Sequence, residues 1–243
     1  MELLFFGRLG STNDKAWELL GQGRPEGLVV AARRQDGGRG QHGARWESRP
    51  WQNLTFSVAL RPDFLPAESM FYLSKSVALG VADFLRSEGI RAAIKWPNDI
   101  YVADKKICGI LIEQRICGER IAQSVVGVGL NVNQRRFAAP HATSMRRCDG
   151  KVRSLREALA ALAAAILRRY EALRAGGEAQ GWAEVDREYA ERLYRGSGFF
   201  PYRCGGKTFS ACVDAALPSG ELVLRLEDGT RRCFAFKEVE FVR

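Results

Sequence analysis

The sequence lacks the cysteine and histidine patterns of a metal site. It contains no pair of cysteines at C-x-x-C spacing and only two histidines, His42 and His141, so the ligand spacing of a structural zinc site is absent. No secretory signal is expected either, because the apolar run 3–6 is too short for a signal-peptide core. The six cysteines are therefore expected to be reduced, mostly buried small hydrophobes in a cytoplasmic protein.

Long hydrophobic runs and blocks of like charge are missing as well. The apolar run 158–167 is far too short to span a bilayer, so no membrane association is expected. The formal net charge is +9, and such a balance attracts phosphate-bearing or acidic partners. Because the basic residues are dispersed, they favour an acidic small molecule or an acidic protein partner over a dedicated nucleic-acid surface.

The pattern of apolar residues and turns in the sequence predicts two regions. Apolar strands are expected at 3–6, 27–32 and 53–60, the last half-buried, with consecutive antiparallel strands at 92–95, 107–114 and 121–132. Helices are expected from Ser11 onward and over 68–87, 153–173 and 182–193. Short strands at 202–204, 208–215, 222–226 and 231–236, joined by glycine turns, predict a small all-β barrel. We therefore expect domains at 1–194 and 195–243.

The segment Gly37–Trp46 packs four glycines, two arginines and an indole into ten residues. Glycine-rich backbone can turn its N–H groups toward an anion without interference from Cβ atoms. Arginine adds a planar fork that matches carboxylate or phosphate oxygens. On composition alone, an anion clamp and a solvated surface loop are equally good interpretations.

A second cluster, Lys95–Asp99, combines a cation, an amide and a carboxylate at a Pro-Asn-Asp sequence, which is also a good turn former. Lys106 follows on the other side of a short predicted hairpin and leads into an apolar strand. A partly desolvated lysine acts strongly on a nearby oxyanion. A solvated lysine is the ordinary alternative.

A third cluster lies in the strand predicted at 121–132. Gly127 and Gly129 waste packing surface there unless something approaches the backbone closely. Asn131 then presents a paired donor and acceptor that suits a purine edge. A β-bulge followed by a turn is the alternative interpretation.

Taken in this order, the clusters resemble those of the biotin protein ligases, from about residue 3 to the C-terminus. The resemblance implies an α+β fold, with a central mixed sheet packed with helices and a small C-terminal SH3-like barrel. The matching positions are Ser11-Thr12-Asn13, Gln35 with Gly38-Arg39-Gly40 and Trp46, Lys95-Trp96-Pro97-Asn98-Asp99, Lys106 with Gly109 and Glu113, and Gly127-x-Gly129-Leu130-Asn131.

The resemblance implies two half-reactions. The biotin carboxylate attacks the α-phosphate of ATP, giving biotinyl-5′-AMP and pyrophosphate, and a lysine of a biotin carboxyl carrier protein domain then takes the acyl group and releases AMP. A carboxylate is already an adequate nucleophile, so positioning and charge neutralisation are what the site must supply. The implied cofactors are ATP and Mg²⁺. The ion would rely largely on phosphate oxygens and water, so no residue is assigned as a metal ligand.

By the same resemblance, the implied catalytic residues are Lys106, Arg39 and Asp99. Lys106 would lie between the carboxylate and the α-phosphate, and Asp99 would orient Lys106 or the incoming lysine. The implied biotin-binding residues are Ser11, Thr12, Asn13, Gln35, Arg39, Gly40, Gln41, Lys106 and Gly109. The implied ATP- or adenylate-binding residues are Arg39, Trp46, Lys95, Asn98, Lys106 and Asn131.

The sequence departs from the family pattern in two ways. Gln41 and Ala44 stand where many relatives have arginine, so the adenylate is expected to be held less firmly. The chain also starts almost at the catalytic domain, so we expect no winged helix and no DNA binding by that route. The basic charge is then expected to serve ATP and an acidic carrier domain. Monomer and homodimer both remain open.

Three alternatives compete with this interpretation. A lipoate or octanoate ligase or transferase shares the fold and the acyl-transfer logic. A non-catalytic, basic nucleic-acid-binding protein would use the C-terminal barrel, which lacks the clustered exposed aromatics and basic stripe of a stacking platform. A degenerate biotin-sensing domain is the third, and the presence of Arg39 and Lys106 speaks against it.

Overall fold

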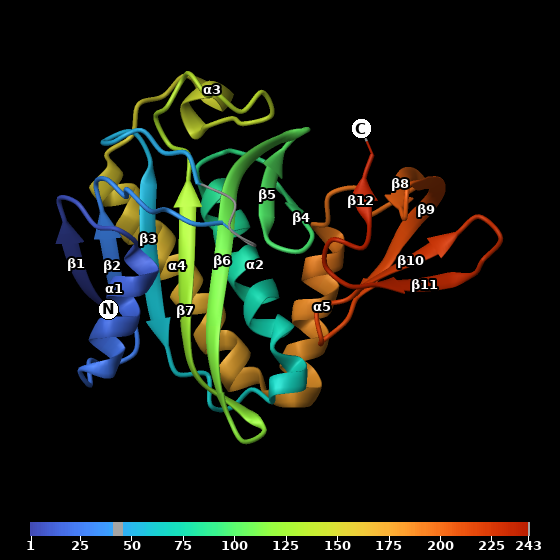
Figure 1. Cartoon of the computed structure of the whole chain (residues 1–243), viewed down its shortest axis with the longest axis horizontal. Coiled ribbons are helices and arrows are strands. Elements are labelled where there is room, and N and C mark those ends of the chain that lie inside the picture. Colours follow the sequence, from blue (N-terminus) through green and yellow to red (C-terminus); the bar gives the residue numbers. More distant parts are fainter. Residues whose placement is uncertain (41–45, 243) are drawn as a thin grey trace.

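A computed structural model describes residues 1–40 and 46–242, which form two sheets and their covering helices. The larger sheet has seven strands in the order β1-β2-β3-β7-β6-β5-β4, and the smaller has five in the order β11-β10-β9-β8-β12 (Figure 1). The strands are β1 Glu2–Phe6, β2 Leu28–Ala32, β3 Leu54–Leu60, β4 Ala93–Lys95, β5 Asp99–Val102, β6 Lys105–Cys117, β7 Arg120–Leu130, β8 Phe200–Cys204, β9 Lys207–Ala216, β10 Leu222–Leu226, β11 Arg231–Phe234 and β12 Glu240–Phe241.

The larger sheet is mixed, as expected. Strands β1 and β2 run parallel because helix α1 (Thr12–Gly21) crosses between them, whereas β2-β3-β7-β6-β5-β4 pair antiparallel. The antiparallel arrangement predicted for 92–132 is confirmed, but strand β5, which was not predicted, lies between β4 and β6 and pairs with both. Strands β6 and β7 form a long hairpin that turns at Gly118, where the backbone has a positive φ of 59° that glycine adopts readily.

Strand β3 corrects the sequence-based expectation. Its alternating pattern predicted a half-buried strand, but all seven of its residues are buried. The reason is that helices cover both faces: α1 packs on one side and α4 (Leu155–Gly176) on the other (Figure 1). Large side chains such as Phe56 face α4, while the small polar Thr55 and Ser57 face α1, where the sheet forms the wall of a cavity.

The predicted helices are present with shifted ends. The region 68–87 divides into a 3₁₀ turn at Ala67–Ser69 and helix α2 (Phe71–Ser87), and a π-helical turn at Gly177–Gly181 joins α4 to α5 (Trp182–Glu191). A short helix, α3 (Met145–Asp149), was not expected. None of the helices in the described part of the chain combines the length and apolar composition that a bilayer crossing requires.

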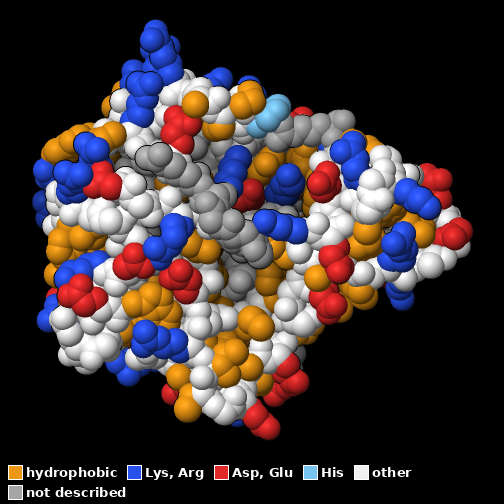
Figure 2. All heavy atoms as spheres, in the orientation of Figure 1, with side chains coloured by type: hydrophobic (Ala, Val, Ile, Leu, Met, Phe, Trp, Pro, Cys, Tyr) orange, Lys and Arg blue, Asp and Glu red, His pale blue; other side chains and the backbone are white. Residues whose placement is uncertain are grey.

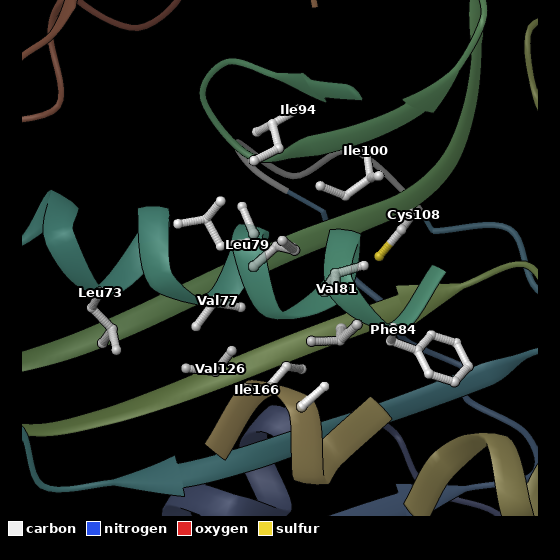
Figure 3. Close-up of a cluster of buried hydrophobic side chains, with 14 of the residues drawn as sticks. Leu73, Val77, Leu79, Val81, Phe84, Ile94, Ile100, Cys108, Val126 and Ile166 are labelled. Atoms are coloured by element: carbon white, nitrogen blue, oxygen red, sulfur yellow. The ribbon is translucent and has the colours of Figure 1, made fainter. Parts of the chain in front are cut away.

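The main core lies behind the larger sheet, where α2 and α4 pack against it. Figure 3 shows Val77 and Val81 of α2 beside Val126 of β7 and Ile166 of α4. Helix α2 comes unusually close to α4 at Gly80, because an added Cβ there would lie 2.8 Å from the Cα of Ile166. This apolar layer gives the opposite face of the sheet a rigid support.

The C-terminal strands form an antiparallel sheet, which agrees with the expected SH3-like unit. This sheet is attached to the rest of the molecule by specific bonds. The Phe71 N–H donates to Pro218 O at 3.0 Å, and Trp96 Nε1 donates to Gly220 O at 2.9 Å. The aromatic ring of Phe236 also reaches the cavity on the larger sheet, so both parts of the chain contribute to that cavity.

Candidate functional site

A cavity of about 240 Å³ opens on the α1 side of the larger sheet. Figure 2 shows Lys and Arg side chains gathered near the middle of the face that carries it. Most of the residues singled out from the sequence line this cavity: Ser11, Thr12, Asn13, Gln35, Arg39, Gly40, Trp46, Asn98, Asp99, Lys106 and Gly109. Residues up to 98 positions apart in the sequence thus meet at one place.

The start of α1 builds one end of the cavity. Ser11 caps the helix, and its Oγ accepts from the Asp14 N–H at 3.4 Å. The Thr12 N–H, which has no partner within the helix, donates to Gln35 Oε1 at 2.7 Å. The helix cap therefore places hydroxyl and amide side chains side by side against the cavity.

Behind these residues lies a buried polar network. Ser57 Oγ is 2.8 Å from Thr12 Oγ1 and 2.6 Å from Asn13 Oδ1, and Asn13 Nδ2 donates to Glu113 Oε2 at 3.0 Å. Thr12, Asn13 and Ser57 are all buried. A network that is buried and satisfied in this way holds its members in fixed orientations.

The other end of the cavity holds an ion pair, in which Lys106 Nζ lies 2.6 Å from Asp99 Oδ1. A shift in the register between β5 and β6 decides where Lys106 points, because Asp99 pairs with Gly109 but Tyr101 pairs with Lys106. Without the shift, Lys106 and Gly109 would face opposite sides of the sheet. With it they share a side, and Lys106 Nζ would lie 3.3 Å from a Cβ placed on Gly109.

The two glycines of β7 allow close approach, as one of the sequence interpretations held. A Cβ on Gly129 would lie 2.3 Å from Cε2 of Trp46, and one on Gly127 would lie 2.4 Å from Asn13 Oδ1. The register of β7 stays regular on both sides through these positions, so the alternative of a β-bulge is wrong. The indole of Trp46 thus lies against the cavity wall at Gly129, and its ring centroid is 5.7 Å from Lys106 Nζ.

Arg39 lies at the cavity rim. Its guanidinium hydrogen-bonds the Asp14 carboxylate, with Nη1 3.1 Å from Oδ2, and Nη2 is 3.8 Å from Glu113 Oε1. The bonds to Asp14 raise the pKa of the Arg39 guanidinium above its usual value. Gln41 lies outside the described residues, so its expected contact with biotin and its effect on adenylate retention stay predictions.

Two predicted nucleotide-binding residues do not line the cavity. Asn131 lies at the end of β7, where its Nδ2 donates to Thr143 O at 2.9 Å, and its buried Oδ1 has no hydrogen-bond partner within the described residues. Lys95, on β4, has its Nζ 3.4 Å from Tyr101 Oη and 5.1 Å from the ring centroid of Phe241. Their roles toward ATP stay predictions.

Comparison with known proteins places this geometry in a family. A model of the biotin/lipoate A/B protein ligase family matches residues 5–131. The chain belongs to this family. The family match confirms the resemblance drawn from the sequence motifs, and residues 5–131 contain every cavity residue named above except Phe236.

Curated relatives and solved structures agree with the family. The chain is 35% identical over 155 residues to the bifunctional ligase/repressor BirA of Bacillus subtilis, covering 61% of this chain and 47% of that protein. It is 33% identical over 144 residues to the biotin–[acetyl-CoA-carboxylase] ligase of Mycobacterium tuberculosis, covering 56% and 52%. The chain thus spans about half the length of these relatives.

The biotin protein ligase of Aquifex aeolicus, solved with biotin and ATP, superimposes with a TM-score of 0.81 at 24% identity and covers 100% of this chain and 99% of that one. At this identity the match establishes the fold, including the C-terminal sheet. It confirms the fold class expected from the sequence.

The role of several residues at the site was not recognised from the sequence. Ser57 was given no role, although it links Thr12 and Asn13. Phe236 lines the cavity from the C-terminal region, and no signal in the sequence connects it to residues more than 100 positions away. Glu113 was noted as a matching position, but its contact with Asn13 emerges only from the pairing of α1 with the sheet.

The described residues offer no ready-made metal site. No group of three or more His, Cys, Asp or Glu side chains within residues 1–40 and 46–242 lies close enough together to hold an ion. The carboxylate of Asp99 is engaged with Lys106, and that of Glu113 with Asn13 and Trp17.

Proposed function

We propose that this chain is a biotin protein ligase, which activates biotin as biotinyl-5′-AMP and transfers it to a lysine of a biotin carboxyl carrier protein domain. One observation carries the proposal: the Lys106–Asp99 ion pair and the polar cap of α1 line a single cavity. The ion pair suits a carboxylate that meets a phosphate. The α1 cap suits a ring that offers N–H and C=O groups.

The family membership supports the reaction class. The family model covers biotin and lipoate ligases, and the named relatives from Bacillus subtilis and Mycobacterium tuberculosis are a ligase/repressor and a biotin ligase. The polar groups of Ser11, Thr12 and Gln35 favour biotin over lipoate, because the dithiolane ring of lipoate would leave them without hydrogen-bond partners inside a cavity.

Lys106 is the residue that we assign to charge stabilisation. During adenylation, the carboxylate of biotin and the α-phosphate of ATP bring negative charge to one point, and a cation about 4 Å away contributes roughly 4 kcal/mol at an effective dielectric near 20. Asp99 holds Lys106 Nζ at the cavity wall. Holding the cation in place beforehand removes the reorganisation that a solvated lysine would need.

Arg39 and Trp46 are proposed to cover the nucleotide end. Arg39 is half-exposed at the rim, where its fork can exchange Asp14 for phosphate oxygens. The buried Trp46 Nε1 has no partner in the described part of the chain. Any Mg²⁺ that accompanies ATP is expected to be held by phosphate oxygens and water.

The remaining assignments complete the proposal. We place the domain boundary at 194/195 and the activity in the cytoplasm, where the free cysteines stay reduced. The net charge of +9 is proposed to speed encounter with an acidic carrier domain, so that transfer slows as ionic strength rises.

The reaction is tested by pyrophosphate release with ATP, Mg²⁺ and one acid at a time. Biotin is expected to stimulate release, whereas lipoate and octanoate leave it at the background rate. Stimulation by lipoate or octanoate but not by biotin would move the chain to the other branch of the family.

A further inference from the structure

A buried chain of polar groups runs from the cavity wall to a carboxylate that does not line the cavity. It begins at Thr12 Oγ1, passes through Ser57 Oγ at 2.8 Å and Asn13 Oδ1 at 2.6 Å, and ends where Asn13 Nδ2 meets Glu113 Oε2 at 3.0 Å. Thr12, Ser57 and Asn13 are nearly inaccessible to solvent. Water therefore cannot replace a missing partner, and each proton in the chain has to be matched to an acceptor.

The carboxylate of Glu113 orients the Asn13 amide. An ionised carboxylate only accepts hydrogen bonds, and Oε2 of Glu113 receives two, from Asn13 Nδ2 and from Trp17 Nε1, both at 3.0 Å. The NH₂ group of Asn13 must then face Glu113. Its Oδ1 consequently faces Ser57.

The orientation of Asn13 fixes the two hydroxyl protons. Ser57 has a single proton, and Asn13 Oδ1 can only accept, so Ser57 donates to Asn13. The contact between Ser57 and Thr12 then needs its proton from Thr12. Because Thr12 gives its proton to Ser57, its Oγ1 offers only lone pairs to the cavity.

The neighbours of Thr12 present hydrogen-bond donors to the cavity. Ser11 Oγ accepts from the Asp14 N–H, which leaves its own proton for the cavity. Gln35 Oε1 accepts from the Thr12 N–H, which leaves the Gln35 amide N–H groups as donors. The wall thus places one acceptor beside donors, a pattern that matches a cyclic urea, whose N–H and C=O groups are adjacent.

We propose that Glu113 is a positioning residue that sets the direction of this proton order and so selects a ligand with an N–H group facing Thr12. The proposal rests on the proposed function, because biotin supplies such a ring. Glu113 acts through Asn13 and Ser57 and touches no ligand atom.

The surroundings leave Asn13 little freedom apart from a flip of its amide. A Cβ on Gly127 would lie 2.4 Å from Asn13 Oδ1, so the amide lies against the β7 backbone. Trp17, which shares Glu113 Oε2, is itself covered by Arg115, with the guanidinium 4.4 Å from the ring centroid. Without the carboxylate, the amide can flip, Ser57 can donate to Thr12, and Thr12 can then donate into the cavity.

The experiment measures ligand binding by calorimetry in the absence of ATP. The ligands are biotin and two cyclic carbamates derived from it. In each carbamate, an oxygen atom replaces one of the two ureido N–H groups. Glu113→Met removes the carboxylate acceptor, whereas Glu113→Gln keeps one oxygen acceptor. Ser57→Ala breaks the hydrogen-bond chain between Thr12 and Asn13. Glu119→Met, on the exposed β6–β7 turn, is the matched control.

Wild type, Glu113→Gln and Glu119→Met are expected to prefer biotin to one of the two carbamates by about 10- to 100-fold, the effect of an unpaired buried acceptor. Glu113→Met and Ser57→Ala are expected to reduce that preference to below about threefold. Their preference against the other carbamate should not change.

The outcomes separate the two proposals. If wild type binds biotin and both Glu113→Met and Ser57→Ala keep the wild-type preference against both carbamates, Glu113 does not set the proton order and the inference is wrong. If wild type does not bind biotin at all, the proposed function fails first. Ser57→Ala keeps the test decisive should Glu113→Met fail to fold, which thermal melts will show.

Discussion

Two lysine–aspartate ion pairs in this protein have the same chemistry and opposite surroundings. Lys75, on α2, pairs with Asp186 of α5, and its side chain is 1% exposed. Lys106, on β6, pairs with Asp99 of β5, and its side chain is 34% exposed at the wall of the cavity.

The partners of Lys75 explain its burial. Besides Asp186, its Nζ donates to Ala216 O of β9 at 2.6 Å, and the ring centroid of Tyr72 lies 4.8 Å away. Desolvation by burial lowers the pKa of Lys75, although the ion pair with Asp186 opposes the shift. This lysine joins α2, α5 and the C-terminal sheet, so its role is structural.

Lys106 has one close carboxylate and the face of Trp46, and otherwise borders the cavity. A cation held on one side and open on the other can act on a ligand. Because both lysines carry a similar ion pair, the role of each is decided by whether its ammonium group is surrounded by protein or faces a cavity.

The largest expected effect is that of Lys106→Ala. Removing the cation should lower the rate of adenylate formation by about 10²- to 10³-fold, the usual loss for one stabilising group at a developing charge. Because the side chain borders a cavity, the melting temperature should stay close to that of wild type. Pyrophosphate release under single-turnover conditions measures the loss, with the exposed neighbour variant Lys105→Ala as control.

Lys75→Ala should show the reverse pattern. Loss of the buried ammonium leaves Ala216 O unpaired and opens a cavity, so the free energy of unfolding should fall by about 2 kcal/mol. The loss stays below that of a fully buried pair because Asp186 remains partly solvated. Urea unfolding measures it, and a change under about 0.5 kcal/mol would erase the distinction between the two lysines.

Gly129→Ala tests the side of Lys106 that faces Trp46 and the cavity. The added Cβ would overlap the indole of Trp46, so the ring must leave the wall next to the cation. We expect the KM for ATP to rise about tenfold, a loss of roughly 1.4 kcal/mol. Gly7→Ala, where an added Cβ meets nothing within 4 Å, is the control, and an unchanged KM for ATP would remove Trp46 from the nucleotide end.

The smallest expected effect is a pH dependence. The pKa of Lys75 is lowered in the folded protein, so the unfolded chain binds this proton more readily. Stability should therefore rise with pH between the folded pKa and the ordinary value of 10.5. Lys75→Met lacks this rise, and urea unfolding of both proteins across that interval isolates it. If the stability of both proteins changed with pH in the same way, burial would not shift the pKa of Lys75.

The sequence predicted most of the helices and strands and the site motifs, but not α3 or β5 and not how the elements meet. Leu159, Leu162 and Ile166 recur at helical spacing, so α4 was evident. That Lys106 and Gly109 share one face depends on a register shift that only strand pairing reveals. The full burial of β3 likewise depends on helices α1 and α4, which lie far apart in the sequence, and local patterns carry no such information.

The most direct test of the central claim is mass spectrometry of the protein after incubation with biotin, ATP and Mg²⁺. The proposed roles of Lys106, Asp99 and the α1 cap predict a bound biotinyl-5′-AMP in the wild-type protein and its near absence in Lys106→Ala. Wild-type protein that forms no biotinyl-5′-AMP, or Lys106→Ala protein that forms as much as wild type, would contradict it.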